Sequence, residues 1–309
     1  MLGSQNAPLF SIQDRKEFMI KNIKKLKSRF IKFKIFYQKE GTYCLIIKII
    51  NHYLRKFKIN IVIFTPLEKY KNYLAKEIIS LSNNKVMYGM YKDTYFKGET
   101  HWNLSDFASK LLGCYELQIQ EKISEIRNKY NLKNIINIGA GEGYHIITLI
   151  KNNYFEKGYA FETSAKGQEI LKINSIKNNI ENKIKIYGEG NFTSIKNNIN
   201  EEELKKSFFI IDIESGEFSF FDKENIKYFN KNHFIIEDHG TSNKILQNNF
   251  YNIIYNNFTL EIINNSSRNP FQFEILNNFS DDEKFLMMSE SRPNTYRWLY
   301  LSPKLSLKN

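Results

Sequence analysis

The stretch "NIINIGAGEGYHIITLIKNNYFEKGYAFETS", residues 134–164, decides the expected fold. An apolar run over residues 134–138 enters a loop with glycine at every second position, and a helical pattern of apolar residues follows. A second apolar run ends at Glu162. Short apolar runs joined through a glycine loop and a helix predict a parallel β-α-β unit, because parallel strands need a crossover connection.

The same alternation of apolar runs and helical patterns continues toward the C-terminus. The expected strands end near the following residues: Ile138, Glu162, Tyr187, Glu214 and Asp238. Five β-α units in succession predict an α/β fold with a doubly wound, mostly parallel, Rossmann-like sheet. Near the end, "NFTLEIIN" and "RWLYLSP" predict a closing pair of strands, one of them antiparallel. We therefore expect residues 105–309 to form this domain and residues 1–104 to form a separate N-terminal region.

The helix expected after Ser164 should bury one face against the sheet. Its apolar residues recur at helical spacing. The predicted buried face consists of Ile170, Leu171, Ile173, Ile176 and Ile180.

Composition excludes several classes of protein. The chain has 309 residues, 42% of them hydrophobic, which is enough for a sizeable core. Cys44 and Cys114 are its only cysteines, so a disulfide framework and a zinc site of three or four thiolates are excluded. The sequence begins without a signal-peptide pattern, and no apolar run is long enough to cross a bilayer. We expect a cytoplasmic protein.

Positive charge is concentrated at the N-terminus. Residues 1–60 hold 14 Lys and Arg against three acidic residues. Two helical stripes predict a basic helical hairpin: Met19, Ile23, Leu26, Phe30 and Phe33, then Ile46, Ile50, Tyr53 and Phe57. The hairpin could pack on the rest of the protein, join a second copy in a homo-oligomer, or lie on the anionic inner face of a membrane. Nucleic acid ranks below these partners, since no base-reading motif accompanies the charge.

The glycine loop predicts the type of ligand. Gly139, Gly141 and Gly143 lack Cβ atoms, so the backbone can approach a ligand closely. A phosphate-binding P-loop would end in Gly-Lys-Ser/Thr, which is absent, and a dinucleotide fingerprint would place its third glycine where Tyr144 stands. Glu162, at the end of the second strand, can accept hydrogen bonds from both ribose hydroxyls. With Asn137, these residues predict a site for a ribose nucleoside without phosphates, such as S-adenosylmethionine.

At this point the sequence resembles class I methyltransferases. "IINIGAGEG" is similar to their first motif and "GYAFETS" to their second, while "IKIYGEGN" resembles the third-strand end that flanks the adenine. The resemblance implies that Gly188 and Glu189 lie beside the adenine. "IIDIESGEFSFF", "FIIEDH" and the upstream "LLGCYELQIQEKI" resemble the FkbM-like methyltransferases over roughly residues 105–240. The likeness departs from that family at Ile210 and Ser215, and it implies O-methylation of sugars and other hydroxylated metabolites.

Acidic residues and a histidine should meet at the strand ends. By two-residue alternation Asp212 and Glu214 share one face of the fourth strand, as do Glu237 and His239 on the fifth, while Glu217 begins the next helix. His239 is the best candidate for general base, because its unperturbed pKa lies near neutral pH. Asp212 and Glu237 are further catalytic candidates, and Asp212 is also expected to contact the methionine part or the acceptor. Glu214 and Glu217 are candidates for binding the substrate. Each of these residues could also have a structural role, and no ligand spacing demands a metal.

Two residues upstream complete the candidate site. Tyr115 and Glu116 could line the acceptor pocket, although a buried aromatic and a helix-surface acid explain them equally well. An Asp-Pro-Pro-Tyr motif after the fourth strand is missing, which disfavours nucleic-acid amino-methylation. The sequence thus predicts an S-adenosylmethionine-dependent methyltransferase of a sugar or glycan hydroxyl. The alternatives are a non-catalytic binding or assembly module that keeps this fold and an NAD-dependent oxidoreductase.

Overall fold

The computed structural model of the chain describes residue 37, residues 41–57, residues 59 and 61, and residues 63–100, 104–292 and 296–304. The chain divides into two compact units, Met1–Tyr70 and Lys71–Asn309. The larger unit contains the sheet, and the smaller one contains a helix over residues 41–56.

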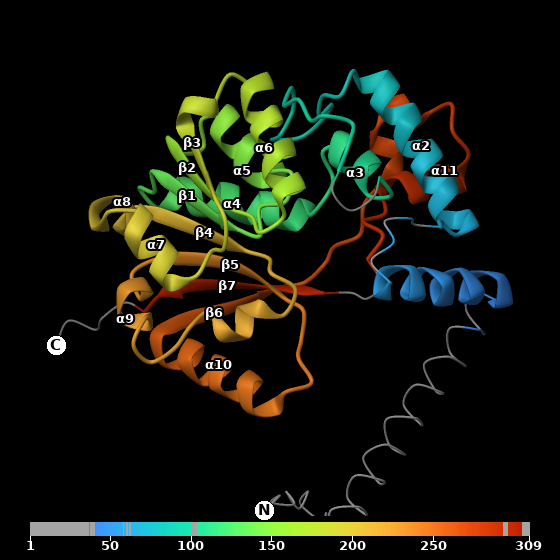
Figure 1. Cartoon of the computed structure of the whole chain (residues 1–309). Helices are drawn as coiled ribbons and strands as arrows, with labels where there is room; N and C mark the ends of the chain where they lie inside the picture. The colour runs from blue at the N-terminus through green and yellow to red at the C-terminus, as the bar shows by residue number, and fades with distance from the viewer. Residues whose placement is uncertain are drawn as a thin grey trace, which may run out of the picture. The chain divides into compact units, whose positions relative to one another are not determined.

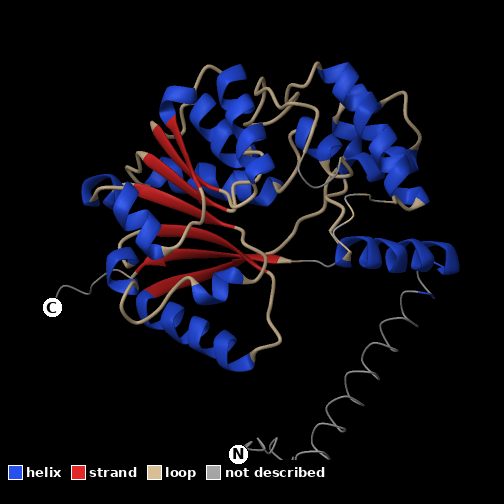
Figure 2. Cartoon of the chain, in the orientation of Figure 1, coloured by secondary structure: helices blue, strands red, loops and turns tan. Residues whose placement is uncertain are grey.

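Seven strands form one sheet in the larger unit (Figures 1 and 2). They are β1 (Asn134–Ile138), β2 (Lys157–Phe161), β3 (Ile184–Tyr187), β4 (Ser207–Ile211), β5 (His233–Asp238), β6 (Phe258–Ile263) and β7 (Arg297–Pro303). Their order is β3-β2-β1-β4-β5-β7-β6. The first five are mutually parallel, and β7 runs antiparallel to both β5 and β6. This confirms the predicted α/β fold, including the antiparallel closing pair.

Helices cover both faces of the sheet (Figure 2). The described helices are α2 (Pro66–Ser82), α3 (Phe107–Leu111), α4 (Leu117–Lys129), α5 (Tyr144–Lys151), α6 (Ala165–Lys177), α7 (Phe192–Asn198), α8 (Glu201–Lys205), α9 (Ile226–Phe229), α10 (Lys244–Asn257) and α11 (Asp281–Met288). Ile135 of β1 packs in one core cluster with residues of α4 and α5, whereas Ile136 packs in a second cluster with residues of α9 and α10. Burial on both faces explains why the adjacent residues Ile135 and Ile136 of β1 are both apolar.

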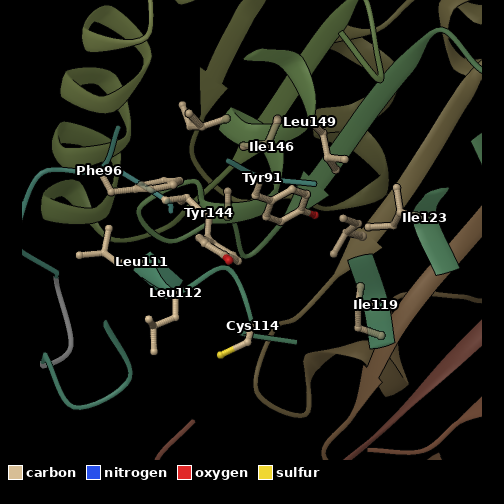
Figure 3. Packing of buried hydrophobic residues seen from close by; sticks show 14 of the residues in the cluster. Tyr91, Phe96, Leu111, Leu112, Cys114, Ile119, Ile123, Tyr144, Ile146 and Leu149 are labelled. Atoms are coloured by element: carbon tan, nitrogen blue, oxygen red, sulfur yellow. The ribbon is translucent and has the colours of Figure 1, made fainter. Parts of the chain in front are cut away.

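Residues 71–104 lie in the same compact unit as the sheet. Ile78 of α2, together with Tyr91 and Phe96 from the following loop, is almost fully buried in the cluster that contains α5. Figure 3 shows Tyr91 and Phe96 beside Tyr144, the first residue of α5. The domain boundary expected at residues 104/105 stays a prediction. In the structure, Ile78, Tyr91 and Phe96 from the segment before this boundary contribute to the core of the larger unit.

Helix α6 differs from the expected apolar face at two residues, of which Ile173 is only half-buried. Ile170, Leu171 and Ile180 are buried as predicted, but Ile176 is 49% exposed. Asn174 and Asn178 occupy the buried face instead, and their side-chain oxygens accept hydrogen bonds from the backbone N–H groups of Lys97 and Tyr95. Because buried backbone donors need acceptors, amides are more favourable here than an aliphatic side chain.

In the smaller unit, the helix over residues 41–56 has the predicted apolar stripe. Its stripe residues Ile46, Ile50 and Tyr53 are exposed, as is Phe57, which follows the helix. The first expected stripe, Met19 to Phe33, lies outside the described residues, so the basic hairpin and its partners stay predictions. Among the helices that the structure describes, none has the length and apolar character to cross a membrane.

Candidate active site

Two cavities open at the carboxyl ends of the parallel strands. Strand order reverses between β1 and β4, and ligands of open α/β sheets bind at such a point. One cavity, of about 780 Å³, is called here the glycine-loop cavity, and the other, of about 390 Å³, the acidic cavity. Four residues line both of them: Gly139, Gly141, Asp212 and Glu214. The two spaces therefore meet at the ends of β1 and β4.

Gly139 and Gly141 form part of the wall that the two cavities share. Gly139 has a φ of 77°, and a Cβ atom there would lie 1.7 Å from the carbonyl oxygen of Asp212. Gly141 has a φ of 54°, and its N–H donates a 2.8 Å hydrogen bond to Oε2 of Glu162. Steric exclusion therefore makes glycine necessary at 139, and the bare loop leaves the cavity open to a ligand.

Gly143 has a different role from the other two glycines. It is the N-cap residue of α5, with a φ of 90°, and it lines neither cavity. A Cβ atom at this position would lie 2.7 Å from Cγ1 of Ile147 and 3.0 Å from Cγ of Leu171. The structure thus places the third glycine in helix packing, whereas the sequence had suggested cofactor contact.

Glu162 is held rigidly at the rim of the glycine-loop cavity. Its Oε2 accepts the N–H of Gly141, and its Oε1 accepts the N–H of Ser164 at 2.7 Å. Gly167 makes room for it, since a Cβ there would lie 2.9 Å from Cγ of Glu162. A carboxylate has about four acceptor sites, so two backbone bonds leave it able to accept the two hydroxyls of a ribose.

The far wall of the glycine-loop cavity is partly apolar. Gly188 and Glu189 line it as the resemblance implied, next to Phe161 and Phe192. Gly188 has no atom within 4 Å of where a Cβ would lie, so space exists for a flat ring. The described residues that line this cavity include no lysine or arginine to neutralise a phosphate. Together these features fit an adenosine that carries no phosphate.

The acidic cavity is lined mostly by charged and aromatic side chains. Its acidic residues are Asp106, Glu116, Glu142, Asp212, Glu214, Glu237 and Glu290. Its basic and aromatic residues are Lys110, His145, His239, Arg292, Tyr115, Tyr144, Tyr296 and Trp298. Asn137, predicted to contact the cofactor, lines this cavity and not the glycine-loop cavity.

Arg292 is the central cation of the acidic cavity. Its guanidinium pairs with carboxylates from three separate segments, Glu116, Glu237 and Glu290. Although burial alone would lower the pKa of Arg292, these carboxylates raise it well above its usual range. The planar guanidinium can satisfy several carboxylates at once, which a lysine could not do with the same geometry.

Glu116 connects Arg292 to a buried histidine. Its Oε2 lies 2.6 Å from Nε2 of His145, whose Nδ1 lies 2.9 Å from the hydroxyl of Tyr91. Burial would raise the pKa of Glu116, but Arg292 and His145 outweigh it and lower the pKa to about 2. Tyr115 lines the same cavity, with Nζ of Lys110 4.7 Å from the centre of its ring. Both upstream candidates therefore line the acidic cavity, and their contact with an acceptor stays a prediction.

His239 is oriented by Glu217. Oε1 of Glu217 accepts the backbone N–H of His239 at 3.0 Å and lies 3.2 Å from its Nδ1. The other ring nitrogen, Nε2, faces Asp212 at 3.4 Å, Glu237 at 3.3 Å and Glu214 at 3.8 Å. Burial lowers the pKa of His239, whereas Glu217 and the other carboxylates raise it above its usual value.

Glu217 lies behind His239 and lines neither cavity. It belongs to a short 3-10 helix, Gly216–Ser219, and its side chain is buried. Glu217, predicted to bind the substrate, thus lies where it can orient the imidazole of His239. Glu214 does face both cavities, but not by strand alternation, because β4 ends at Ile211 and Glu214 has a φ of 52°.

Asp212 and Glu237 are crowded together. Burial raises the pKa of Asp212, and the neighbouring Glu116 raises it further. Burial also raises the pKa of Glu237, as do Asp212 and Glu116, while Arg292 opposes the shift. Carboxylates this close favour a shared proton or a bound cation between them.

Sequence reasoning found His239 and four acids of the acidic cavity, but it missed the other basic residues and three acids, Asp106, Glu142 and Glu290. His145, Arg292 and Lys110 come from α5, from the segment before β7 and from α3. None has a motif or spacing that marks it, because each reaches the cavity through tertiary packing.

Several solved structures are distantly similar to this chain. No family model and no curated protein matches the chain. Among solved structures, the human methyltransferase 10 domain containing protein has 13% identity and a TM-score of 0.47, covering 76% of this chain and 96% of that one. A candidate caffeoyl-CoA O-methyltransferase from Staphylococcus aureus has 15% identity and a TM-score of 0.37, covering 61% and 84%. A candidate tRNA (m1A22) methyltransferase from Streptococcus pneumoniae has 12% identity and a TM-score of 0.39, covering 61% and 72%. Similarities this weak carry no argument about ligand or substrate.

Proposed function

We propose that this chain is an S-adenosylmethionine-dependent methyltransferase that methylates a hydroxyl of a sugar, a glycan or a similar hydroxylated acceptor. One observation carries the proposal: a cavity suited to an adenosine without phosphates joins a cavity rich in hydrogen-bond acceptors. The two meet at Gly139, Gly141, Asp212 and Glu214.

The chain offers a partner for each part of the cofactor. Glu162 would accept the ribose hydroxyls, and Gly188 and Glu189 would lie beside the adenine. Gly139 and Gly141 would let the methionine part pass close to the backbone, with Asp212 near its ammonium group. The cofactor supplies an electrophilic methyl group on a sulfonium.

The chemistry asks mainly for orientation. The acceptor oxygen forms a bond to the methyl carbon as the carbon–sulfur bond breaks, a neutral thioether leaves, and the hydroxyl proton is released. Holding the oxygen in line with the methyl group can supply roughly 7 to 11 kcal/mol of the barrier. His239, with Nδ1 facing Glu217, presents Nε2 to the acceptor side, where it can take the proton or bind a cation.

The acidic cavity suits a polyhydroxylated acceptor. Ionised carboxylates only accept hydrogen bonds, so they pair with hydroxyl donors. Tyr115, Tyr296 and Trp298 add aromatic surface on which an apolar ring face could pack. An anionic acceptor would meet the excess of acidic side chains, which disfavours a phosphorylated substrate.

Isothermal titration with S-adenosylhomocysteine tests the cofactor half of the proposal. We expect binding in the micromolar range, and Glu162→Gln should weaken it about 10- to 100-fold through loss of charge-assisted hydrogen bonds. Glu169→Gln is the matched control, because this substitution removes the same charge from an exposed residue of the neighbouring helix α6. No binding to the folded protein, or equal effects of the two variants, would refute this half.

Mass spectrometry tests the acceptor half. Glycan and metabolite fractions incubated with the protein and methyl-labelled cofactor should gain one labelled methyl group per product. Binding of S-adenosylhomocysteine without transfer to any such fraction would favour a non-catalytic binding module.

A further inference from the structure

The junction of the two cavities carries a cluster of possible metal ligands. Nε2 of His239 and one carboxylate oxygen each of Asp212 and Glu214 lie within 4.8 Å of one another. The pairwise distances from Nε2 are 3.4 Å to Asp212 and 3.8 Å to Glu214. The cluster combines an imidazole with two carboxylates, so it is more than a group of acids.

The imidazole is held as a metal-binding histidine would be. The side chain of His239 is 5% exposed, and Nδ1 is occupied by the buried carboxylate of Glu217. A carboxylate on the far nitrogen is the usual outer support of a histidine ligand, because it fixes the ring and its tautomer. That tautomer leaves the lone pair of Nε2 directed at the carboxylates.

Nε2 has no satisfactory hydrogen-bond partner in the described part of the chain. Its nearest polar neighbours are oxygens of Glu237, Asp212 and Glu214, at 3.3 to 3.8 Å. A charge-assisted N–H···O bond would be about 2.7 to 2.9 Å long. In the described part of the chain Nε2 thus faces three carboxylates without a hydrogen bond to any of them, whereas Nδ1 makes one to Glu217 at 3.2 Å.

These distances fit ligands that share one ion. Two ligands at right angles around a cation with bonds of about 2.1 to 2.4 Å lie about 3.0 to 3.4 Å apart. The separation of His239 and Asp212 falls at the upper end of this range. Glu214 is somewhat farther, but its side chain is 76% exposed and can move inward.

The charge balance also favours a divalent cation. Arg292 pairs with Glu116, Glu237 and Glu290, and of these Glu237 also lies 3.3 Å from Nε2 of His239. Among the described residues, His239 is the only basic side chain that pairs with Asp212 or Glu214. The junction therefore gathers three carboxyl groups, of Asp212, Glu214 and Glu237, around one imidazole.

We propose that Asp212, Glu214 and His239 bind a divalent cation of the Mn²⁺ or Mg²⁺ class at the junction of the two cavities. The carboxylate oxygens suit both ions, the imidazole nitrogen favours Mn²⁺ over Mg²⁺, and space is left for water or an acceptor hydroxyl. The binding site itself does not depend on the proposed function. The role of the cation does rest on the proposed function, because a cation here would hold the acceptor oxygen and lower the pKa of the acceptor hydroxyl. His239 would then be a ligand and not the general base.

Electron paramagnetic resonance of Mn²⁺ tests the site on the full chain after chelator treatment. Titration should show about one bound Mn²⁺ per chain at micromolar affinity, displaced by excess Mg²⁺. Glu214→Gln should weaken binding at least tenfold without loss of folding, since the residue is exposed, and His239→Gln should weaken it at least as much. Glu169→Gln, which removes an exposed acid elsewhere, should bind as the parent chain does.

The outcomes separate this inference from the proposed function. Absence of Mn²⁺ binding at millimolar concentration, or binding that neither Glu214→Gln nor His239→Gln changes, overturns the metal site. S-adenosylhomocysteine is titrated into the same metal-free sample, so a positive cofactor result with no Mn²⁺ binding removes only the metal. Mn²⁺ binding without cofactor binding would keep the site and remove the proposed function.

Discussion

Replacing Gly139 by alanine tests whether the loop after β1 is shaped by steric exclusion. Gly139 has a φ of 77°, which costs an alanine about 1 to 2 kcal/mol. The added Cβ would also lie 1.7 Å from the carbonyl oxygen of Asp212, a backbone atom that cannot rotate away. Relief requires the ends of β1 and β4 to separate, which endangers the hydrogen bond from the Asp212 N–H to the Ile138 carbonyl, worth about 1 kcal/mol.

These contributions together predict a loss of about 2 to 3 kcal/mol in the free energy of unfolding. For a domain of this size that corresponds to a fall of about 4 to 12 °C in the melting temperature. Because both cavities lie beside Gly139, S-adenosylhomocysteine should also bind at least tenfold more weakly.

Gly188→Ala provides the matched control for this experiment. Gly188 lines the glycine-loop cavity too, but a Cβ there meets no atom within 4 Å and its φ is not in the left-handed range. Its melting temperature should therefore match that of the parent chain. A Gly139→Ala protein that melts within 1 °C of the parent and binds the ligand equally well would refute the reasoning.

Three further changes test the electrostatics and packing of the larger unit. Burial and the nearby Lys129 lower the pKa of His233 to about 4, so the unfolded state binds more protons and stability falls as pH drops from about 6.5 toward 4. From His233 we expect the free energy of unfolding to fall by about 2 kcal/mol between pH 7 and pH 5. In urea unfolding at these two pH values, His233→Gln should therefore show a fall that is smaller by this amount. Arg292→Gln should destabilise the fold by about 3 to 5 kcal/mol in urea unfolding at pH 7, because it leaves buried carboxylates without their cation. Asn174→Leu should cost about 2 to 3 kcal/mol by thermal melting through two lost buried hydrogen bonds, whereas the exposed Ile176→Asn should change stability by less than about 0.5 kcal/mol.

The central parallel strands were predictable because they are buried on both faces. In β1 the adjacent Ile135 and Ile136 are both buried, since β2 and β4 flank the strand and helices cover it. The end of β4 was less predictable. The alternation of Asp212 and Glu214 continues the strand pattern, yet Glu214 and Ser215 both adopt positive φ values and turn the chain into the next helix. Turns made by non-glycine residues leave little trace in the sequence.

The candidate site was predictable where it follows a strand and unpredictable elsewhere. Asp212 and His239 directly follow parallel strands, whose carboxyl ends meet at one edge of the sheet. Arg292 lies in the segment before β7 and reaches Glu116 across 176 residues. Only tertiary packing brings such a pair together, and a single sequence contains no local pattern that reports it.

The three glycines of the loop show why one motif can carry more than one constraint. Gly143 is required by its φ of 90° and by packing against Ile147 and Leu171, so its presence is explained by the fold. Gly141 differs, because its N–H donates to Glu162 and couples the loop to the end of β2. The loop and the acid therefore form one structural unit, in which the backbone orients the carboxylate. For this reason the inference of a ribose nucleoside depends on the pairing of Gly141 with Glu162, and not on the number of glycines.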